Sequence, residues 1–170
     1  MRVGRERCET GFTCSQRASR IRAVMNDVVD PGTRSKMMSR IKSKNSKPEV
    51  NLRSALHLLG FRFRIHRKDL PGKPDIVLPM YRAAILVHGC FWHRHGCHLT
   101  ATPKSNSDFW EAKFEANVLR DARQLRALAE GGWRVAVIWE CELRKAGAEE
   151  VAERVARWLI GDSAHIQIPA

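Results

Sequence analysis

The sequence predicts an α/β domain in which a mixed central sheet is flanked by helices. Three short runs, residues 75–78, 83–87 and 133–139, are mostly apolar, contain β-branched side chains and are bounded by turn residues, as buried strands are. Segments with the apolar spacing of helices lie before, between and after these runs. Because a helix-sized connection separates the last two runs, we expect those strands to be parallel neighbours in one sheet.

The first 60 residues divide into a leader, an arm and a helix. Residues 1–24 lack apolar periodicity, which predicts a disordered basic leader; the alternative is that the protein starts at Met25. Residues 25–45 are basic, and they predict either a frayed helix or an arm that lies along DNA. Ser46 and Glu49 have the spacing of a capping box, and Gly60 is a natural end for the helix that follows. We expect its buried face to consist of Val50, Leu52, Ala55, Leu56 and Leu59.

The remaining elements alternate between strands and helices. Residues 61–65 alternate apolar and basic side chains and predict a half-exposed strand, and residues 70–74 predict a turn. A long helix should run from Ser107 or Asp108 to about Leu128, and an amphipathic helix should span residues 148–160. The predicted order is helix, three strands, helix, strand, helix, with an antiparallel meander before one parallel crossover. Both Trp133 and Trp139 are expected in the core, and the inner positions of the long helix should be Phe109, Phe114, Val118, Leu125 and Leu128.

The charge of the chain points to a polyanionic partner. Thirty Lys and Arg residues against eighteen Asp and Glu residues give a formal net charge of +12, which favours nucleic acid. No apolar stretch approaches the ~20 residues that span a bilayer, and the polar N-terminus has no signal-peptide core. We therefore expect a cytoplasmic protein with reduced thiols and no membrane partner.

The densest group of chemically reactive side chains is the run ILVHGCFWHRHGCH, residues 85–98. It begins inside a predicted strand and ends in a loop, where α/β proteins keep their functional sites. In a reducing compartment, clustered cysteine and histidine predict a closed, structural zinc site, although ordinary reduced cysteines remain the alternative. The rival nitrogen ligands are His93 and His98. The predicted ligands are Cys90, His95 and Cys97 from this loop and Cys141 from the end of the neighbouring parallel strand.

A second group of residues predicts nuclease chemistry. Asp75 follows a proline and enters a strand of the meander, a position at which many nucleases hold Mg²⁺. The lysine and second acidic residue typical of the next strand are absent, and Val87 and His88 stand there instead. A histidine would then have to accept the proton from water, and His88 and His93 are the candidates. Glu49 is expected to cap its helix, and the alternative is a supporting role in the active site.

Seven short motifs follow one another along the chain: PGKPD at 71–75, HGCFWHRHGC at 88–97, FW at 109–110, NV at 117–118, RD at 120–121, GWRV at 132–135 and WEC at 139–141. Together they resemble the very-short-patch repair (Vsr) family of DNA mismatch endonucleases. The likeness runs from about Thr33 to Ile160, and its HGCFWH run is specific. It implies a restriction-endonuclease-like core, which agrees with the predicted order of elements. It also implies an enzyme that nicks one DNA strand beside a T:G mismatch, left by deamination of 5-methylcytosine, and so begins very short patch repair.

The resemblance implies roles for individual polar residues. Asp75 and the backbone carbonyl of Val87 would bind Mg²⁺, and His93 would be the general base that acts on water. The site would be completed by His88, Glu49 and Asp121. One family member has a threonine where Val87 stands, but valine offers the same carbonyl. The matching structural zinc ligands are Cys90, His95, Cys97 and Cys141.

The resemblance also implies a DNA-binding surface. Phe91, Trp92 and Trp110 would be inserted into the base stack beside the mismatch, where opening a weakened step costs least. On residues alone, Trp110 fits the core equally well. The basic arm would grip the opposite groove. The residues expected on DNA outside the aromatic group are Arg34, Lys36, Met37, Met38, Ile41 and Lys113.

Three functions compete on this basis. The leading one is a Mg²⁺-dependent, zinc-stabilised mismatch endonuclease with an arm at 25–45 and an endonuclease domain at 46–162. We expect it to act as a monomer on the bacterial nucleoid, with a MutL-type repair protein as a candidate partner. The alternatives are a nuclease of the same fold with a restriction-type target and a non-catalytic zinc-stabilised DNA-binding module. Asp75 together with His93 favours an enzyme, because a binding module needs neither.

Overall fold

A four-stranded mixed sheet forms the centre of the protein. The computed structural model describes residues 30, 32, 33, 36, 39, 44–103 and 106–169. The strands stand in the order β1-β2-β3-β4, with β1 antiparallel to β2 and the other two pairs parallel. The predicted mixed α/β class and the parallel pairing across the long crossover are therefore confirmed. The strands are β1 (Ile76–Leu78), β2 (Ala83–His88), β3 (Arg134–Trp139) and β4 (His165–Ile168).

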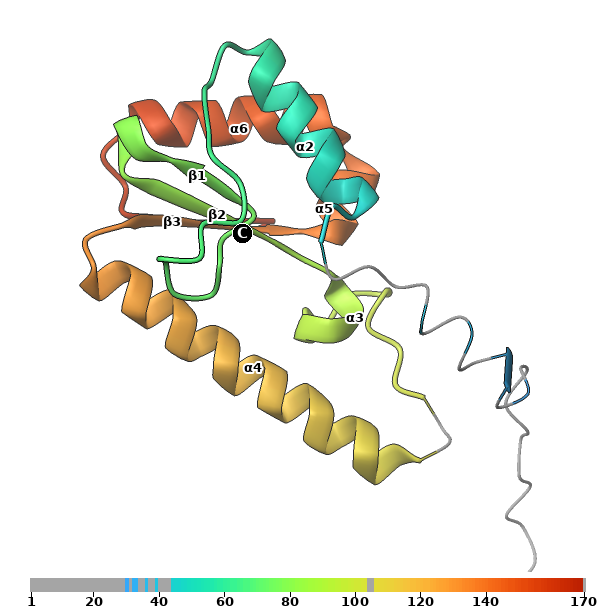
Figure 1. Ribbon diagram of the computed structural model, residues 1–170. Coiled ribbons are helices and arrows are strands. Elements are labelled where there is room, and N and C mark those ends of the chain that lie inside the picture. The colour runs from blue at the N-terminus through green and yellow to red at the C-terminus, as the bar shows by residue number, and fades with distance from the viewer. Residues whose placement is uncertain are drawn as a thin grey trace, which may run out of the picture.

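Helices cover both faces of this sheet (Figure 1). On one face lie α2 (Lys47–Leu58), α5 (Glu140–Lys145) and α6 (Ala148–Ile160), and on the other lies the long α4 (Ser107–Glu130). A turn of 3₁₀-helix, η1 (Pro79–Tyr81), joins β1 to β2, and the short α3 (Cys90–His93) follows β2 directly. None of the helices in the described ranges is long and apolar enough to cross a membrane.

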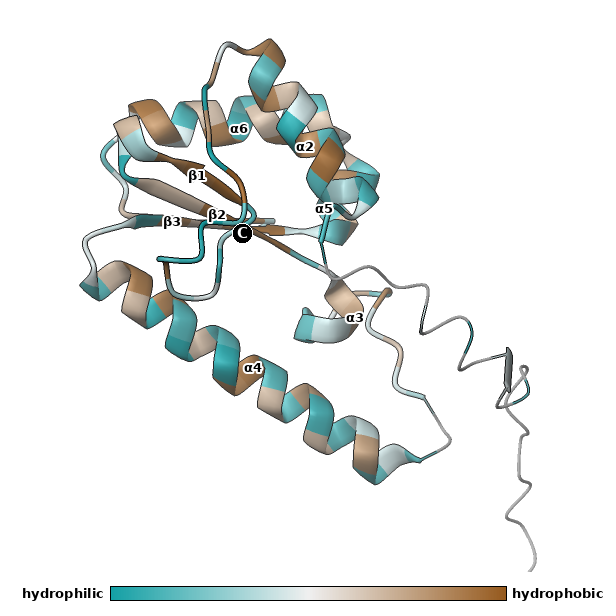
Figure 2. Cartoon of the chain, in the orientation of Figure 1, coloured by the Kyte–Doolittle hydropathy of each residue, from teal (hydrophilic) through white to brown (hydrophobic). Residues whose placement is uncertain are grey.

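Alternate residues of each strand supply two apolar layers, as the period of a strand requires. Ile76, Ile85 and Ile138 pack toward α2 and α6, whereas Val77, Leu86 and Val135 belong to the layer beneath α4. Figure 2 shows the strands as hydrophobic and the outer faces of the helices as mixed or hydrophilic. The alternation has a consequence for function: it places His88, two residues after Leu86, on the α4 side of the sheet.

Helix α2 begins as predicted but buries a different face. The capping box between Ser46 and Glu49 is present, and Leu52 is fully buried. Val50 is 43% exposed, because it lies about 200° around the helix from Leu52. Its place on the buried face is taken by Glu49 and Arg53. The other residues of the predicted face are Ala55 and Leu56, which are buried, and Leu59, which is exposed beyond the last turn.

Helix α4 shows the same exchange of apolar for polar residues. It spans the predicted range, and both Phe114 and Leu128 are buried. Phe109 and Val118, predicted to be inner positions, are exposed, whereas Asn117 and Asp121 are buried. Leu125 is partly buried against the layer beneath α4. The buried polar residues Asn117 and Asp121 thus face the sheet where β2 ends.

One predicted element is absent from the described part of the chain, and some observed elements were not predicted. Residues 61–65 are not a strand, because only Arg64 pairs with β1, through two backbone hydrogen bonds of 2.8 Å with Val77. The chain then turns away at His66, which has a φ of 50°. Conversely, β4 and α5 lie where no element was predicted. Helix α6 has the predicted bounds, Trp139 is buried, and Trp133 packs half-buried against the layer beneath α4.

The proposed leader and most of the arm are not described. The leader, residues 1–24, and Arg34, Met37, Met38 and Ile41 of the arm lie outside the described residues. Lys36 is described and exposed. The contacts of these arm residues with DNA therefore stay predictions.

Candidate active site

A cleft of about 690 Å³ opens where β1 begins and β2 ends. These two points are adjacent because the strands are antiparallel, and the parallel β3 brings its own end to the same edge. The start of α2, the turn at 72–75, helix α3 and the middle of α4 complete the walls. The polar residues that line the cleft are Lys44, Ser46, Glu49, His66, Lys73, Asp75, His88, His93, Lys113, Asn117, Arg120, Asp121, Gln124 and Glu140.

Asp75 is the half-buried carboxylate at the mouth of β1. Its Oδ2 accepts a hydrogen bond of 2.8 Å from the backbone N–H of Val87. Burial raises the pKa of Asp75 to about 6, partly offset by the Val87 hydrogen bond, and the Glu49 charge adds to the increase. A carboxylate held away from water in this way takes up a proton more readily, and a bound cation would favour its charged form.

The strand register bears on the backbone groups of Val87. The backbone N–H and carbonyl of Val77 both bond to Arg64. Because these groups alternate in direction along a strand, the N–H and carbonyl of Ile76 point toward β2. Continuing the register by two residues sets Pro74 opposite Val87. A proline has no N–H to donate, so this strand position leaves the Val87 carbonyl without its usual ladder partner. The use of that carbonyl as a cation ligand stays a prediction.

His88, His93 and Asp121 form a compact group on the α4 side of the cleft. The two imidazole rings stack in parallel, with centroids 3.9 Å apart and planes 8° apart. The Nδ1 atom of His93 is hydrogen-bonded to the Asp121 carboxylate. A metal ion bonds imidazole nitrogen in the plane of the ring, so two parallel stacked rings cannot both direct a lone pair at one ion without turning. The group is therefore better suited to moving protons than to holding a metal.

Electrostatics assign protonation states within this group. Burial acts to raise the pKa of Asp121, but the hydrogen bond with His93 and the neighbouring positive charges outweigh it and hold the pKa below its ordinary value. An ionised Asp121 is only an acceptor, so Nδ1 of His93 carries the proton and Nε2 is free to accept one. Burial, reinforced by the charge of His93, lowers the pKa of His88 to about 3, so His88 is neutral at pH 7.

Glu49 is buried at the edge of the cleft and all its acceptor sites are in use. Oε1 accepts from the backbone N–H and the hydroxyl of Ser46, at 3.3 and 2.7 Å. Oε2 accepts from the backbone N–H of Asn45 at 2.9 Å and from Arg53 at 3.0 Å. A carboxylate with four donors fits the capping role and a supporting place beside Asp75.

The four predicted zinc ligands come together at the same edge of the sheet. The parallel register pairs His88 with Trp139, so the chain segments two residues further on, at Cys90 and Cys141, also meet. The four ligand atoms, from these two cysteines, His95 and Cys97, lie within 4.8 Å of one another. Nδ1 of His95 is 3.3 Å from Sγ of Cys141 and 3.9 Å from Sγ of Cys90.

These separations fit a tetrahedral zinc site. Zinc bonds of about 2.3 Å to sulfur and about 2.1 Å to nitrogen place such ligand atoms roughly 3.6 Å apart. The rival ligands are elsewhere, since His93 pairs with Asp121 and His98 is exposed. The ring of Trp139 stacks on His95 at 4.3 Å and fixes its orientation. A cysteine-rich set of this kind suits a structural ion, while Asp75 suits a harder one.

The aromatic residues of α3 and α4 form one cluster, here called the aromatic cluster: Phe91, Trp92, Phe109, Trp110 and Phe114. Phe91 lies at its centre, with edge-on contacts to the other rings at centroid distances of 4.9–5.7 Å for Trp92, Trp110 and Phe114. Phe91, Trp92 and Trp110 are half-buried, and Phe109 is exposed. The Asn117 amide donates to the backbone carbonyl of Trp92 at 3.1 Å and ties α3 to α4.

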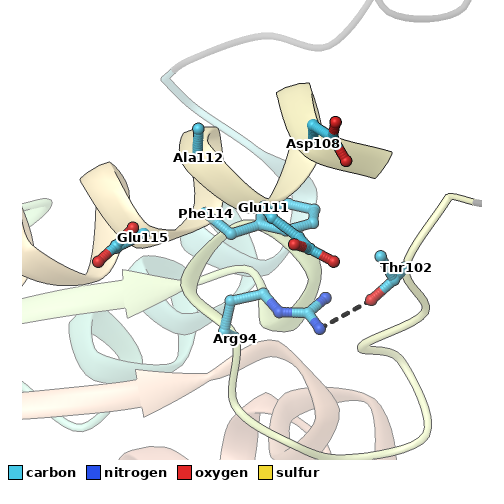
Figure 3. Close-up of a pocket in the computed structure, with 7 residues that line it drawn as sticks. All are labelled: Arg94, Thr102, Asp108, Glu111, Ala112, Phe114 and Glu115. Carbon is cyan, nitrogen blue, oxygen red and sulfur yellow. Dashed lines mark hydrogen bonds between the residues drawn. The ribbon is translucent and has the colours of Figure 1, made fainter. Parts of the chain in front are cut away.

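Basic side chains surround the cleft, whereas a second hollow is acidic. Lys44, Lys73, Lys113 and Arg120 line the cleft, as a polyanion requires. The second hollow, about 530 Å³, lies between the start of α4 and the loop after α3, where Arg94 donates to Thr102 at 2.9 Å (Figure 3). Three carboxylates line that hollow and would repel phosphate: Asp108, Glu111 and Glu115.

The structure adds residues to the site that the sequence did not reveal. Arg53, Asn117 and Lys73 had no assigned role, yet each contacts or lines the cleft. A signal for two of them existed in helical spacing, because Arg53 follows Glu49 by four residues and Asn117 precedes Asp121 by four. Every predicted active-site and zinc-site residue within the described ranges lies at one edge of the sheet.

Comparison with known proteins identifies the family of this chain. A family model described as DNA mismatch endonuclease Vsr matches residues 26–99. A type II nicking enzyme, V.XorIIP of Xanthomonas oryzae pv. oryzae, is 54% identical over 130 residues, which cover 76% of this chain and 96% of that protein. The DNA mismatch endonuclease Vsr of Escherichia coli K12 is 44% identical over 147 residues, 85% of this chain and 94% of that protein. The type II nicking enzyme V.NmeAIP of Neisseria meningitidis serogroup A is 44% identical over 134 residues, 78% of this chain and 96% of that protein. With the identity and coverage of these relatives, this chain belongs to the Vsr family of DNA mismatch endonucleases.

Proposed function

We propose that the protein is an endonuclease that nicks one strand of duplex DNA beside a T:G mismatch, with Mg²⁺ as its catalytic ion and Zn²⁺ as a structural one. The observation that carries this proposal is the position of Asp75 and His93 in one cleft, within electrostatic reach of each other. The names of the relatives, a mismatch endonuclease and nicking enzymes, support the reaction class. A T:G mismatch left by 5-methylcytosine deamination is the proposed substrate, and the nick would begin very short patch repair.

The residues of this chain divide the chemistry among them. Asp75 and the Val87 carbonyl supply oxygen ligands of the kind that Mg²⁺ prefers, and a bound Mg²⁺ would polarise the scissile phosphate. Asp121 holds the proton on Nδ1 of His93, which leaves Nε2 to accept a proton from the attacking water. The neutral His88 ring stacks on His93 and restricts its rotation. Glu49 supports the carboxylate side of the cleft.

The four cysteine and histidine side chains would bind an ion that stabilises the fold. The proposed zinc ligands are Cys90, His95, Cys97 and Cys141, and they join the loop after β2 to the start of α5. Since α3 begins at Cys90 and ends at His93, a zinc ion there would also fix the helix that carries the proton acceptor. Four protein ligands close a zinc site and leave no position for substrate.

The DNA would lie over the basic rim of the cleft, next to the aromatic cluster. Phe91, Trp92 and Trp110 are proposed to enter the base stack at the mismatch. Lys113, on the rim, and Arg34 and Lys36 of the arm would contact phosphates. The apolar side chains of the arm would touch bases in the opposite groove: Met37, Met38 and Ile41. We further propose a monomer that works on cytoplasmic, nucleoid DNA with help from a MutL-type protein, in line with the bacterial origin of the relatives.

The test uses matched duplexes that differ only in one base. The full chain is incubated with Mg²⁺ and end-labelled duplexes that contain a T:G mismatch or a C:G pair at the same position. We expect a nick in one strand of the T:G duplex, and Asp75→Ala should abolish it while DNA binding persists. Cutting of the C:G duplex at a similar rate would instead identify a restriction-type nuclease. Loss of binding together with nicking in Asp75→Ala would favour a DNA-binding module.

A further inference from the structure

Arg53 is a buried arginine on the face of α2 that packs against the rest of the domain. Its exposed fraction is 8%, and its helix positions one turn either side of it, Glu49 and Leu56, are also buried. Burying a guanidinium costs several kcal/mol unless hydrogen-bond acceptors surround it. The acceptors around Arg53 therefore fix the position of its side chain. Arginine in such a place is expected to fix the groups that it binds.

The contacts of Arg53 join three segments of chain. Nη2 donates to Oε2 of Glu49 at 3.0 Å and to the backbone carbonyl of Asp75 at 3.1 Å. Nη1 donates to Oδ1 of Asn45 at 2.6 Å. These acceptors belong to the first turn of α2, the start of β1 and the connection from the arm. One planar side chain therefore sets the spacing between all three.

This arrangement controls the position of the Asp75 carboxylate. The carbonyl of Asp75 is held by Arg53, and its side chain is held by the N–H of Val87 at 2.8 Å. The backbone and the side chain of Asp75, which lines the cleft, are thus both held in place. The charge of Arg53 also opposes that of Glu49 at Asp75, because it lowers the pKa of Asp75 whereas the Glu49 charge raises it.

Asn45 completes the arrangement at the end of the arm. It has a φ of 55°, a conformation that asparagine tolerates better than most residues. Its N–H donates to Glu49, and its Oδ1 accepts from Arg53 and contacts Nε2 of His66 at 3.1 Å. The last residue before the helix cap is therefore bonded to the same ion pair that holds Asp75.

We propose that Arg53 is a positioning residue for the catalytic cation, which acts by holding Asp75 and Glu49 in the geometry that binds the ion. The inference rests on the proposed function, because it assumes that Asp75 binds Mg²⁺. Residues that orient metal ligands in this way typically change metal affinity roughly 10–100-fold when they are replaced.

The experiment compares Arg53→Met with a matched salt-bridge variant. Arg154 pairs with Glu142 between α6 and α5, away from the cleft, so Arg154→Met removes an equivalent pair. Two quantities are measured for each variant: the Mg²⁺ concentration that gives half-maximal nicking of the T:G duplex, and the Kd for Mn²⁺ without DNA, from electron paramagnetic resonance. We expect Arg53→Met to raise both about tenfold or more. Arg154→Met should lower the Tm and leave both unchanged.

Two additional variants keep the result interpretable. Arg53→Lys can reach one or two of the acceptors, so it should recover part of the cation affinity. Asn45→Gly removes one acceptor and keeps the positive φ, so it should shift both measurements in the same direction by less, even if Arg53→Met does not fold. The proposal is wrong if Arg53→Met and Asn45→Gly lower the Tm but keep the wild-type Mg²⁺ midpoint of nicking and the wild-type Kd for Mn²⁺.

The two measurements separate this inference from the proposed function. If the wild-type protein nicks the T:G duplex and Arg53→Met keeps the same Mg²⁺ midpoint, the positioning role fails and the endonuclease remains. If the wild-type protein fails to nick but binds Mn²⁺ in a manner that depends on Arg53, the positioning role stands and the substrate assignment fails.

Discussion

The Nδ1 atom of His93 is hydrogen-bonded to the carboxylate of Asp121, and this contact joins α3 to α4 across the cleft. Arg120 donates to the other oxygen of Asp121 at 3.2 Å, so the carboxylate is held from both sides. An acidic residue in this place sets which nitrogen of the imidazole carries a proton, as it does in other acid–base pairs. The pair therefore gives His93 a defined direction for accepting a proton.

Replacement of Asp121 by asparagine should reduce the rate of nicking and leave DNA affinity largely unchanged. The new side chain could still hydrogen-bond to His93, but its amide could donate to Nδ1 and favour the wrong tautomer. In a comparable pair the same replacement costs about 10⁴-fold in kcat, so we expect a loss of roughly 10²–10⁴-fold. The measurement is the rate constant of nicking in a single turnover, with the protein in excess of the DNA and both above the Kd of their complex. Asp108→Asn, on an exposed turn of the same helix, is the control and should nick at the wild-type rate.

Replacement of Asp75 by asparagine should stabilise the protein at neutral pH in the absence of Mg²⁺. The folded state raises the pKa of Asp75 from 3.8 to about 6, so it binds the proton more tightly than the unfolded state does. Stability is therefore lost as pH rises through this window, by at most ~3 kcal/mol. Urea unfolding of Asp75→Asn should show a gain of ~1–3 kcal/mol at pH 7.5 and none near pH 3.5. Equal gains at both pH values would contradict this account, and the exposed Asp162→Asn should show no gain at either.

Replacement of Cys141 by serine should release the proposed zinc and lower stability. Its sulfur is 3.3 Å from the ligand nitrogen of His95, and it is the member of the set contributed by the start of α5. Loss of a structural metal belongs to the few changes that cost about 4 kcal/mol or more, which corresponds to a Tm decrease of roughly 10 °C. Metal analysis by mass spectrometry should find one zinc per wild-type chain and less in Cys141→Ser. His98→Ala should keep both its zinc and its Tm, because His98 is exposed.

The parts of the fold that the sequence predicted are those decided by local pattern. The run at 133–139 is apolar on both faces, and the connection before it has the length of a helix, so its parallel place beside β2 could be expected. Strand β4 could not, since only Ile168 among its four residues is buried and its pairing depends on how α6 returns the chain to the sheet. Residues 61–65 carried the alternating pattern of a strand, but pairing ends after Arg64.

The site was predictable where chemistry is concentrated in one short run. His88, His93 and the cysteine ligands stand within or beside the segment 85–98, so their types and spacing indicated the two sites. Arg53 and Asn117 gave only the weaker signal of a four-residue spacing from Glu49 and Asp121, because polar residues on a helix are expected to face water. Only the packing of α2 and α4 around the end of β2 turns them inward, and that depends on contacts far apart in the sequence.

Replacement of Trp92 by alanine should weaken the response to the mismatch more than it weakens the fold. Trp92 is half-buried and contacts Phe91 at a centroid distance of 4.9 Å, and it is the member of the aromatic cluster that lines the cleft, where the DNA is proposed to lie. Stacking of one base on an aromatic ring contributes ~1–3 kcal/mol, which predicts a fall of roughly 5–150-fold in nicking at low DNA concentration.

The measurement for Trp92→Ala follows the base stack directly. A T:G duplex with 2-aminopurine beside the mismatch should brighten when the wild-type protein unstacks that base, and much less with Trp92→Ala. The matched control is Trp133→Phe, because Trp133 packs beneath the Arg67 guanidinium and against the layer under α4, on a surface that does not line the cleft. If both variants lowered the Tm and neither changed the fluorescence increase, the aromatic cluster would be part of the core only. An unchanged Tm with a lost fluorescence increase in Trp92→Ala alone would show that unstacking beside the mismatch depends on this ring.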